Sequence, residues 1–305
     1  MSQNRCMGIS QYIKDIGRGK DGARSLDRAK AADLLGQVLD GSVSDLEVGA
    51  FCLAMRIKGE TAAEMAGFLD ATHARLNRMP DNGLTTVVLP SYNGARKLPV
   101  LTPLLALLLA QRGAAVIIHG TATESSRVTS ASVLQDLHVK AHAQVTSLAA
   151  GEVALIPTEV LCPGLKRLLD VRRVVGLRNS AHSLVKLMNP CSGKALVVGS
   201  YTHPEYALSM AATFALTGQH ALLLRGTEGE PVADPRRTPQ MEVFRHGQSE
   251  IVQIAQAGSL VQVPDLPGPE ATDTARYIQA VLNGEFPIPP SIALQVEHIL
   301  REVQA

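Results

Sequence analysis

The chain has 305 residues and a mass of 32.4 kDa, which predicts two domains or one large α/β unit rather than one small domain. Hydrophobic residues make up 46% and charged residues 19% of the chain, a composition that supports a sizeable core and excludes wholesale disorder. Aromatic residues make up only 3%, and Trp is absent. This composition disfavours a protein that stacks nucleic-acid bases on an aromatic platform.

Membrane and metal signals are weak in the sequence. The longest apolar run, residues 98–110, contains Thr102 and Pro103 and is too short to cross a bilayer. Residues 1–30 contain no secretory apolar segment. Because the cysteines show no paired spacing, we expect neither a zinc site nor a disulfide framework. They are Cys6, Cys52, Cys162 and Cys191. We therefore expect a soluble cytoplasmic protein.

The net charge of +1 conceals an uneven distribution. Residues 164–194 hold seven basic residues and one acid, a net charge of +6, whereas residues 1–30 carry +4 and residues 223–305 carry −5. A concentrated basic segment can attract a polyanion even in a near-neutral chain, because the local field matters more than the total charge. A solvated helix face is the alternative interpretation.

Helical patterns fill the first third of the chain. Residues 31–39 have helical spacing and end at Asp40-Gly41. Two capping boxes, Ser44 with Glu47 and Thr61 with Glu64, predict the starts of two further helices. The apolar stripe of the first is Leu46, Ala50, Leu53, Ala54 and Ile57, and that of the second is Met65, Phe68, Leu69, Thr72 and Leu76. Residues 77–86 resemble a linker.

Beyond the linker, predicted strands alternate with predicted helices, which favours a mostly parallel sheet with helices on its faces. The strands are residues 87–89, 115–119, 153–156, 195–199 and 221–225. The helices are residues 102–112, 127–137, 203–217, 270–282 and 290–303, and residues 229–248 form a polar, Pro-rich passage. The predicted fold class is α/β, with a small helical N-terminal domain and a larger α/β domain.

Three loops follow predicted strands, at the sheet edge where ligands bind in open α/β folds. The first is Ser91-Tyr92-Asn93-Gly94-Ala95-Arg96-Lys97. Its Asn-Gly pair permits a tight turn with positive φ, its basic residues supply charge, and Thr102-Pro103 resembles a helix start. Such a loop before a helix can hold a phosphate. An ordinary turn with solvated basic side chains is the equal alternative.

The second loop is His119-Gly120-Thr121, which leads to Ser125-Ser126-Arg127. A lone His is more often structural than catalytic, and no base–nucleophile pair is visible at this spacing. The third loop is residues 226–230, in which Glu228 and Glu230 could ligate Mg²⁺. A surface turn is the more frequent explanation of that pattern.

Several motifs together resemble the family-3 glycosyltransferases, the family of anthranilate phosphoribosyltransferase. Residues 44–71, with Lys58-Gly59-Glu60-Thr61, resemble the helical N-terminal domain of that family. HGTATESS resembles its K-H-G-N…S-S loop, RRVVGLRN its R-x-x-L-G-x-R segment, and Asn189-Pro190 its T-N-P turn. The resemblance implies a fold like those of anthranilate phosphoribosyltransferase and nucleoside phosphorylase. It also implies a helical domain of residues 1–80, with about 163–190 packed against it, and an α/β domain of residues 86–305.

The active-site residues of the family are largely replaced. Ser91-Tyr92-Asn93-Gly94-Ala95 stands where the enzymes have the G-T-G-G-D loop for the pyrophosphate of phosphoribosyl pyrophosphate. Ile118 and Thr121 replace the Lys and Asn of K-H-G-N, and the Mg²⁺-binding Asp-Glu pair falls on Pro231-Val232. The resemblance therefore implies loss of the reaction. A vestigial pocket would remain, formed by His119, Gly120, Thr121, Ser125, Ser126, Glu228 and Glu230.

The departures resemble the YbiB-type relatives of the enzyme, in the segments IGRGKDGARSLDR, PSYNGARK, GLRNSAHSLVKL, THPEY and RGTEGE. That resemblance implies a homodimer without transferase activity that binds single-stranded DNA or RNA with little sequence preference. The candidate contact residues are Lys166, Arg167, Arg172, Arg173, Arg178 and Lys186. No cofactor is expected. The alternative is an active phosphoribosyltransferase that uses Mg²⁺ and phosphoribosyl pyrophosphate on an unidentified base, and a protein-binding regulator is a third possibility.

Overall fold

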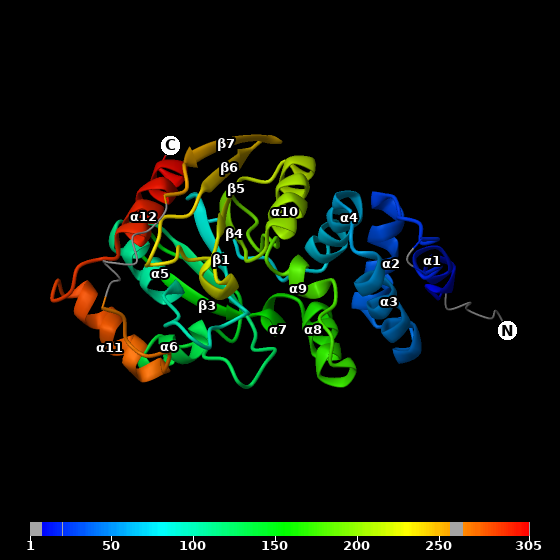
Figure 1. The fold of residues 1–305 in the computed structure, drawn as a ribbon, viewed down its shortest axis with the longest axis horizontal. Coiled ribbons are helices and arrows are strands. Elements are labelled where there is room, and N and C mark those ends of the chain that lie inside the picture. The colour runs from blue at the N-terminus through cyan, green and yellow to red at the C-terminus, as the bar shows by residue number, and fades with distance from the viewer. Residues whose placement is uncertain (1–7, 20, 257–264, 305) are drawn as a thin grey trace. The chain divides into compact units, whose positions relative to one another are not determined.

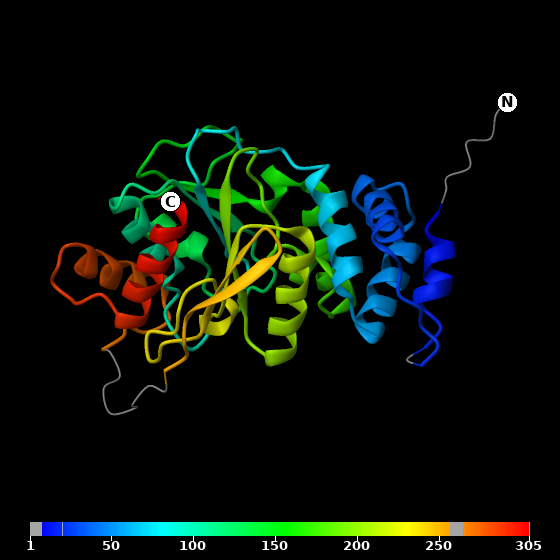
Figure 2. The same cartoon turned by 90° about the horizontal axis from the view of Figure 1, so that it is seen from above.

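The computed structural model describes residues 8–19, 21–256 and 265–304. The chain divides into two compact units (Figures 1 and 2). The first, the helical unit, consists of Met1–Leu76 and Cys162–Met188. The second, the α/β unit, consists of Asn77–Leu161 and Asn189–Ala305. The chain thus leaves the helical unit after residue 76 and returns to it for the basic segment.

The helical unit contains α1 (Ser10–Ile16), α2 (Arg28–Asp40), α3 (Asp45–Lys58), α4 (Ala62–His73), α8 (Pro163–Val175) and α9 (Ala181–Leu184). Both capping boxes are confirmed: Ser44 caps α3 with Glu47, and Thr61 caps α4 with Glu64. In each, the side chain of the capping residue accepts the third backbone N–H of the helix while the glutamate reaches back. Local hydrogen-bonding chemistry therefore determines where these helices begin.

The predicted apolar stripe of α3 does not lie in the core. Phe51, Cys52 and Met55 are the buried residues of this helix, and the predicted stripe faces outward. Leu46 is 84% exposed, Leu53 47% and Ile57 58%. The periodicity predicted the helix correctly, but the helix has two apolar faces. The face that contains Phe51 is the one buried in the core, where Phe51 packs edge-on against Phe68 of α4.

The α/β unit is built on a seven-stranded sheet of order β3-β2-β1-β4-β5-β6-β7. All five predicted strands are confirmed, and they pair in parallel. They are β1 (Thr86–Pro90), β2 (Val116–Gly120), β3 (Val153–Pro157), β4 (Ala195–Tyr201) and β5 (Ala221–Arg225). Because the strands run in parallel, their carboxyl ends and the loops that follow lie at one edge.

The polar passage predicted at residues 229–248 is wrong in part. It contains β6 (Met241–Arg245), which pairs antiparallel with β5, and β7 (Gln248–Gln253) follows it. The two strands join at His246-Gly247, where both residues have positive φ, 51° and 81°. Two consecutive residues with positive φ are typical of a type I′ hairpin turn. The usual sequence signal of this turn is Asn-Gly or Asp-Gly, so His246 in the first position makes the turn harder to recognise.

Helices cover both faces of the sheet. Helices α5 (Thr102–Gln111) and α12 (Pro290–Val303) share one apolar core with the strands, whereas α10 (Pro204–Thr217) packs on β4 and β5 from the other side (Figure 1). The remaining elements are α6 (Ser130–Asp136), α7 (Thr158–Leu161), the 3-10 turn η1 (Thr227–Gly229) and α11 (Ala271–Leu282). Within the described ranges, every helix is too short or too polar to span a bilayer.

Candidate functional site

The loops after β1, β2 and β5 meet at the carboxyl edge of the sheet. The Ser91 amide donates to the His119 carbonyl over 2.8 Å, and Ala95 pairs with Val128 in both directions. The β5 loop then reaches across to the β1 loop through Glu228 and Glu230. The segment that we name the cradle loop, residues 91–98, is thereby held from two sides.

Glu230 anchors the first half of the cradle loop from inside the protein, where it is 1% exposed. Its Oε2 accepts hydrogen bonds from the Ser91 hydroxyl and, over 3.2 Å, from the Thr102 hydroxyl. Its Oε1 accepts the Gly94 N–H over 2.7 Å. The Ser91 hydroxyl also lies 2.7 Å from that of Ser130. These three donors satisfy the buried carboxylate and tie it to the loop.

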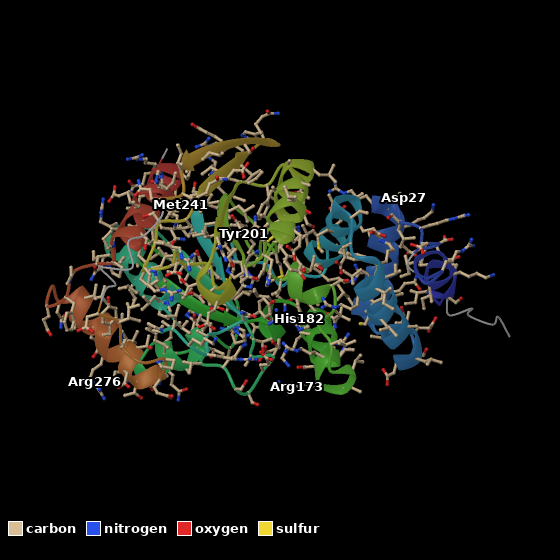
Figure 3. The ribbon with its side chains drawn as sticks, viewed as in Figure 1. Asp27, Arg173, His182, Tyr201, Met241 and Arg276 are labelled. Carbon is tan, nitrogen blue, oxygen red and sulfur yellow. The ribbon has the colours of Figure 1, made fainter. Side chains whose placement is uncertain are left out.

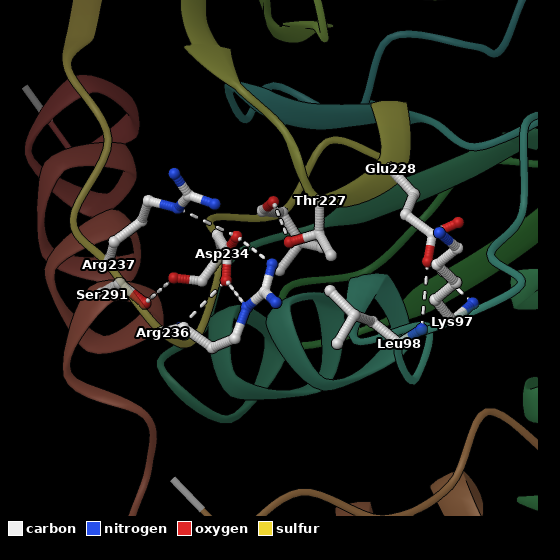
Figure 4. A network of polar contacts seen from close by, with 9 residues as sticks. Lys97, Leu98, Thr227, Glu228, Asp234, Arg236, Arg237 and Ser291 are labelled. Atoms are coloured by element: carbon white, nitrogen blue, oxygen red, sulfur yellow. Dashed lines mark hydrogen bonds and ion pairs between the residues drawn. The ribbon is translucent and has the colours of Figure 1, made fainter. Parts of the chain in front are cut away.

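Glu228 binds the second half of the cradle loop (Figure 4). Its Oε2 accepts the Arg96 N–H over 3.0 Å. Its Oε1 accepts the N–H groups of Lys97 and Leu98 over 2.9 and 3.0 Å. The Asn93 side-chain amide donates to the backbone carbonyl of the same glutamate. Three successive backbone N–H groups therefore converge on one carboxylate, the arrangement of an anion-binding nest.

The loop after β2 supports the cradle loop from the opposite side. Gly94 has φ of +65°, and an added Cβ there would lie 2.5 Å from the Val128 carbonyl oxygen. Arg127 donates to the Gly94 carbonyl over 3.0 Å and also binds Glu124. Glu124 in turn accepts from Arg96 over 2.8 Å. The sequence placed Arg127 beside the second loop but gave no sign of its contact with the cradle loop, and it did not single out Glu124, because no local spacing links either residue to a loop about thirty residues earlier.

The expectation of a surface turn at residues 226–230 is wrong. Gly226, Thr227 and Glu230 are buried. A Cβ on Gly226 would lie 1.9 Å from the Glu230 carbonyl oxygen, so the turn closes too tightly for any side chain there. Glu228 has φ of +50°, a left-handed conformation that costs energy in a non-glycine residue. Its carboxylate and that of Glu230 bind the cradle loop in this structure.

The other residues of the predicted vestigial pocket differ in burial. His119 is fully buried and pairs within the sheet with Pro90 and Ile156. Gly120 and Thr121 are half-buried, whereas Ser125 and Ser126 are exposed. An added Cβ on Gly120 would lie 2.2 Å from the Ser91 carbonyl oxygen. His119 and Gly120 therefore belong to the closely packed edge of the sheet.

Helix α8 carries four of the six predicted contact residues. The Lys166 ammonium binds Asp170 one turn later. Arg173 lies 3.4 Å from the same carboxylate, as helical spacing requires. Arg167 is exposed, but one guanidinium nitrogen donates to the Leu39 carbonyl of α2 over 2.7 Å. Asp170 thus offsets one positive charge of this surface, and the Arg167 contact helps to dock α8.

The remaining contact residues lie around α9. Lys186 and Arg178 are half-buried, and Asn179 ties the two helices together by donating to the Leu168 carbonyl over 2.7 Å. Burial is the largest cause that lowers the pKa of His182, and with the positive charges of Arg178, Arg172 and Arg56 the pKa falls to about 4. Figure 3 marks His182 and Arg173 in this unit.

The His182 pKa reveals a member of the positive region that sequence reasoning missed. Arg56 belongs to α3, more than a hundred residues before Arg172 and Arg178, yet all three act on one buried imidazole. We name Arg56, Lys166, Arg167, Arg172, Arg173, Arg178 and Lys186 the basic surface. Arg56 is the member of this surface that the sequence did not suggest, because the sequence does not show that α3 and α8 belong to one unit.

Comparison with known proteins identifies the family. The chain is 39% identical over 299 residues to the protein YbiB of Escherichia coli K12, covering 95% of this chain and 92% of that one. It belongs to the YbiB-like proteins. This YbiB-like chain is also 30% identical over 285 residues to anthranilate phosphoribosyltransferase of Anaeromyxobacter sp. strain K, covering 91% and 83% of the two chains. Residues 10–75 match the glycosyl transferase family helical bundle domain.

Solved structures agree on the fold. The YbiB-like chain superposes on anthranilate phosphoribosyltransferase of Thermus thermophilus with a TM-score of 0.73 at 22% identity, covering 96% of this chain and 89% of that one. The Saccharomyces cerevisiae enzyme in complex with PRPP and Mg gives 0.69 at 15% identity, with coverages of 97% and 88%. The predicted fold class is confirmed: a small helical domain joined to an α/β domain with a mostly parallel sheet.

Proposed function

We propose that this protein is a non-catalytic, cytoplasmic homodimer that binds single-stranded DNA or RNA with little sequence preference. The observation that carries the proposal is the basic surface of the helical unit. Arg172 and Arg173 lie in the last turn of α8, and 63% of the Arg173 side chain is exposed. The charges of Arg172, Arg178 and Arg56 all lower the pKa of His182. Such a concentration of guanidinium groups favours phosphate as the ligand.

The composition of the basic surface supports phosphate contacts rather than base recognition. It contains five arginines and two lysines and no aromatic side chain on which a base could stack. Contacts of this kind are indifferent to sequence, and they release counterions, so binding weakens steeply with salt. We therefore infer low sequence specificity.

The exposed stripe of α3 supports the homodimer. Leu46, Leu53 and Ile57 follow one another at helical spacing on the outer face. An apolar row of this kind on the surface is typical of an interface. Because Arg56 lies beside it on the same helix, two-fold pairing along α3 would bring two basic surfaces together, one from each protomer.

The hydrogen bonding of the cradle loop supports the absence of transferase activity. The Gly94, Arg96, Lys97 and Leu98 N–H groups, which a phosphate would need, donate to Glu230 and Glu228. A phosphate that entered the loop would have to displace a carboxylate. Similarity to the family does not by itself show that this chain catalyses the family's reaction, because one fold can serve many functions.

Charge reversal tests the proposal. Replacing Arg172, Arg173 and Arg178 with Glu should weaken binding of every oligonucleotide at least tenfold and flatten the salt dependence by about 2 log units per log unit. The matched control replaces Arg112, Arg276 and Arg301, three exposed arginines of the α/β unit, and changes net charge equally. Equal weakening by both triple variants, or unchanged affinity in the folded first variant, would contradict the site.

The alternative function is a phosphoribosyltransferase, which the 30% identity to anthranilate phosphoribosyltransferase favours. It requires saturable binding of phosphoribosyl pyrophosphate with Mg²⁺. Titration calorimetry separates the two: we expect no binding at millimolar ligand, whereas a saturable heat would support the enzyme.

A further inference from the structure

The cradle loop binds Glu228 as it would bind an external oxyanion. Both carboxylate oxygens are used, Oε2 by Arg96 and Oε1 by Lys97 and Leu98, all through backbone N–H groups at 2.9–3.0 Å. Backbone donors of this kind are fixed in position and do not depend on any side chain at these positions. Contacts that do not involve Glu228 also hold this loop, namely the Gly94 N–H to Glu230, Arg127 to the Gly94 carbonyl and the pairing of Ala95 with Val128.

Arg236 is a cation that senses the charge of Glu228. The hydrogen bond to Asp234 is the largest cause of the raised pKa of Arg236, and the negative charge of Glu228 raises it further. Arg236 and Asp234 are joined by bonds of 2.9 and 2.8 Å (Figure 4). Because the Asp234 carboxylate already pairs with this guanidinium group, the attraction for an anion rests chiefly on the N–H groups of the loop.

The backbone at Glu228 indicates that the contact is imposed by its surroundings. Its φ and ψ are 50° and 21°, a region in which glycine is comfortable and glutamate is not. The turn around it is fixed by the hydrogen bond from the Glu230 amide to Thr227 and by that from Thr227 to Val232. Glycine at position 228 would suit this backbone and would lack the carboxylate.

We propose that residues 96–98 form a latent oxyanion site, which the Glu228 carboxylate fills as an internal ligand and so closes to phosphate. The ligand class is a single tetrahedral phosphate group, because three N–H donors match two or three of its oxygens. This inference concerns the α/β unit and does not depend on nucleic-acid binding by the helical unit.

The test follows the Lys97 amide by NMR in protein labelled with [¹⁵N]lysine, with the signal assigned through Lys97→Arg. Inorganic phosphate is added at constant ionic strength. In Glu228→Gly we expect a saturable shift of the Lys97 amide, with a Kd at least tenfold below that of the wild type. The matched control is His246→Gly, which removes a positive-φ side chain (φ 51°) from the β6–β7 turn and should behave as the wild type.

A folded Glu228→Gly variant without a saturable shift would overturn the proposal, as would equal phosphate binding by wild type and variant. If Glu228→Gly does not fold, Glu228→Asn replaces it, because Asn also tolerates this backbone and is too short to span the same contacts. Oligonucleotide affinity, measured on the same samples, should remain within twofold of the wild type. Loss of nucleic-acid binding in both proteins would contradict the proposed function and leave the oxyanion site standing.

Discussion

At the scale of single residues, Glu230 is the carboxylate on which the cradle loop most depends. It accepts from Ser91, Gly94 and Thr102 in a buried setting. In Glu230→Ala these donors lose their acceptor, so the free energy of unfolding should fall by about 3 kcal/mol. Glu230→Gln should lower it by about half as much. Urea unfolding measures both. Glu242→Ala, at a half-buried position of β6, is the control, and a loss as small as the control's would contradict the assigned role.

His182 should make stability depend on pH. Its pKa is about 4 in the folded chain, but about 6.5 in an unfolded one, so below pH 6.5 the unfolded chain takes up a proton that the folded chain does not. The stability due to the lowered pKa is present above pH 6.5 and is lost as pH falls toward 4, by up to about 3 kcal/mol.

Unfolding midpoints in urea at pH 7.5 and pH 4.5 measure this loss. The comparison uses His182→Asn, whose Oδ1 can accept the Asn179 N–H that Nδ1 accepts over 3.2 Å. Other titrating groups contribute equally to both proteins. The wild type should therefore lose more stability than the variant over this range, and identical losses would refute the assignment.

At the scale of elements, the two capping boxes look alike in sequence but differ in burial. Glu64 is fully buried, accepts the Leu26 N–H over 2.8 Å and binds Lys58 over 2.7 Å. Glu47 is only half-buried and accepts the N–H groups of Ser44 and Ile9. Burial therefore separates two motifs that the sequence cannot rank.

Alanine substitution should reveal the difference. Glu64→Ala leaves the Lys58 ammonium, 8% exposed, without its carboxylate and should cost about 4 kcal/mol. Glu47→Ala removes a cap interaction at the surface and should cost about 1 kcal/mol. Thermal unfolding of the two variants in parallel measures the ratio, and equal costs would show that burial does not decide it.

The elements also show where sequence reasoning succeeds. Helix α12 begins and ends as predicted because Pro290 at its start and the apolar spacing behind it are local signals. Strands β6 and β7 were not predicted, because polar residues and prolines precede the hairpin and because its turn begins with His246. The hydrogen bonds between Glu228 and the cradle loop join residues about 130 positions apart in the sequence. Rules based on local residue spacing cannot predict a contact over that separation. The sequence left anion binding and an ordinary turn as equal interpretations of this loop, and it gave no sign of the contact with Glu228.

At the scale of the whole molecule, the stripe on α3 predicts the oligomeric state. Replacing Leu53 and Ile57 with Asp should convert a dimer to a monomer in sedimentation velocity, because it buries charge in an apolar interface. Leu208→Asp, at an exposed apolar position of α10 (75% exposed), should leave the dimer intact. A wild-type monomer, or dissociation by both changes, would contradict pairing along α3.

Fluorescence anisotropy of a labelled single-stranded oligonucleotide tests the central claim most directly, in titrations from about 50 to 300 mM salt. We predict tight binding at low salt that weakens by several log units per log unit of salt, at about 0.7 for each phosphate contacted, and equally for oligonucleotides of unrelated sequence. No binding at the lowest salt would contradict the account and make the basic surface a solvated helix face.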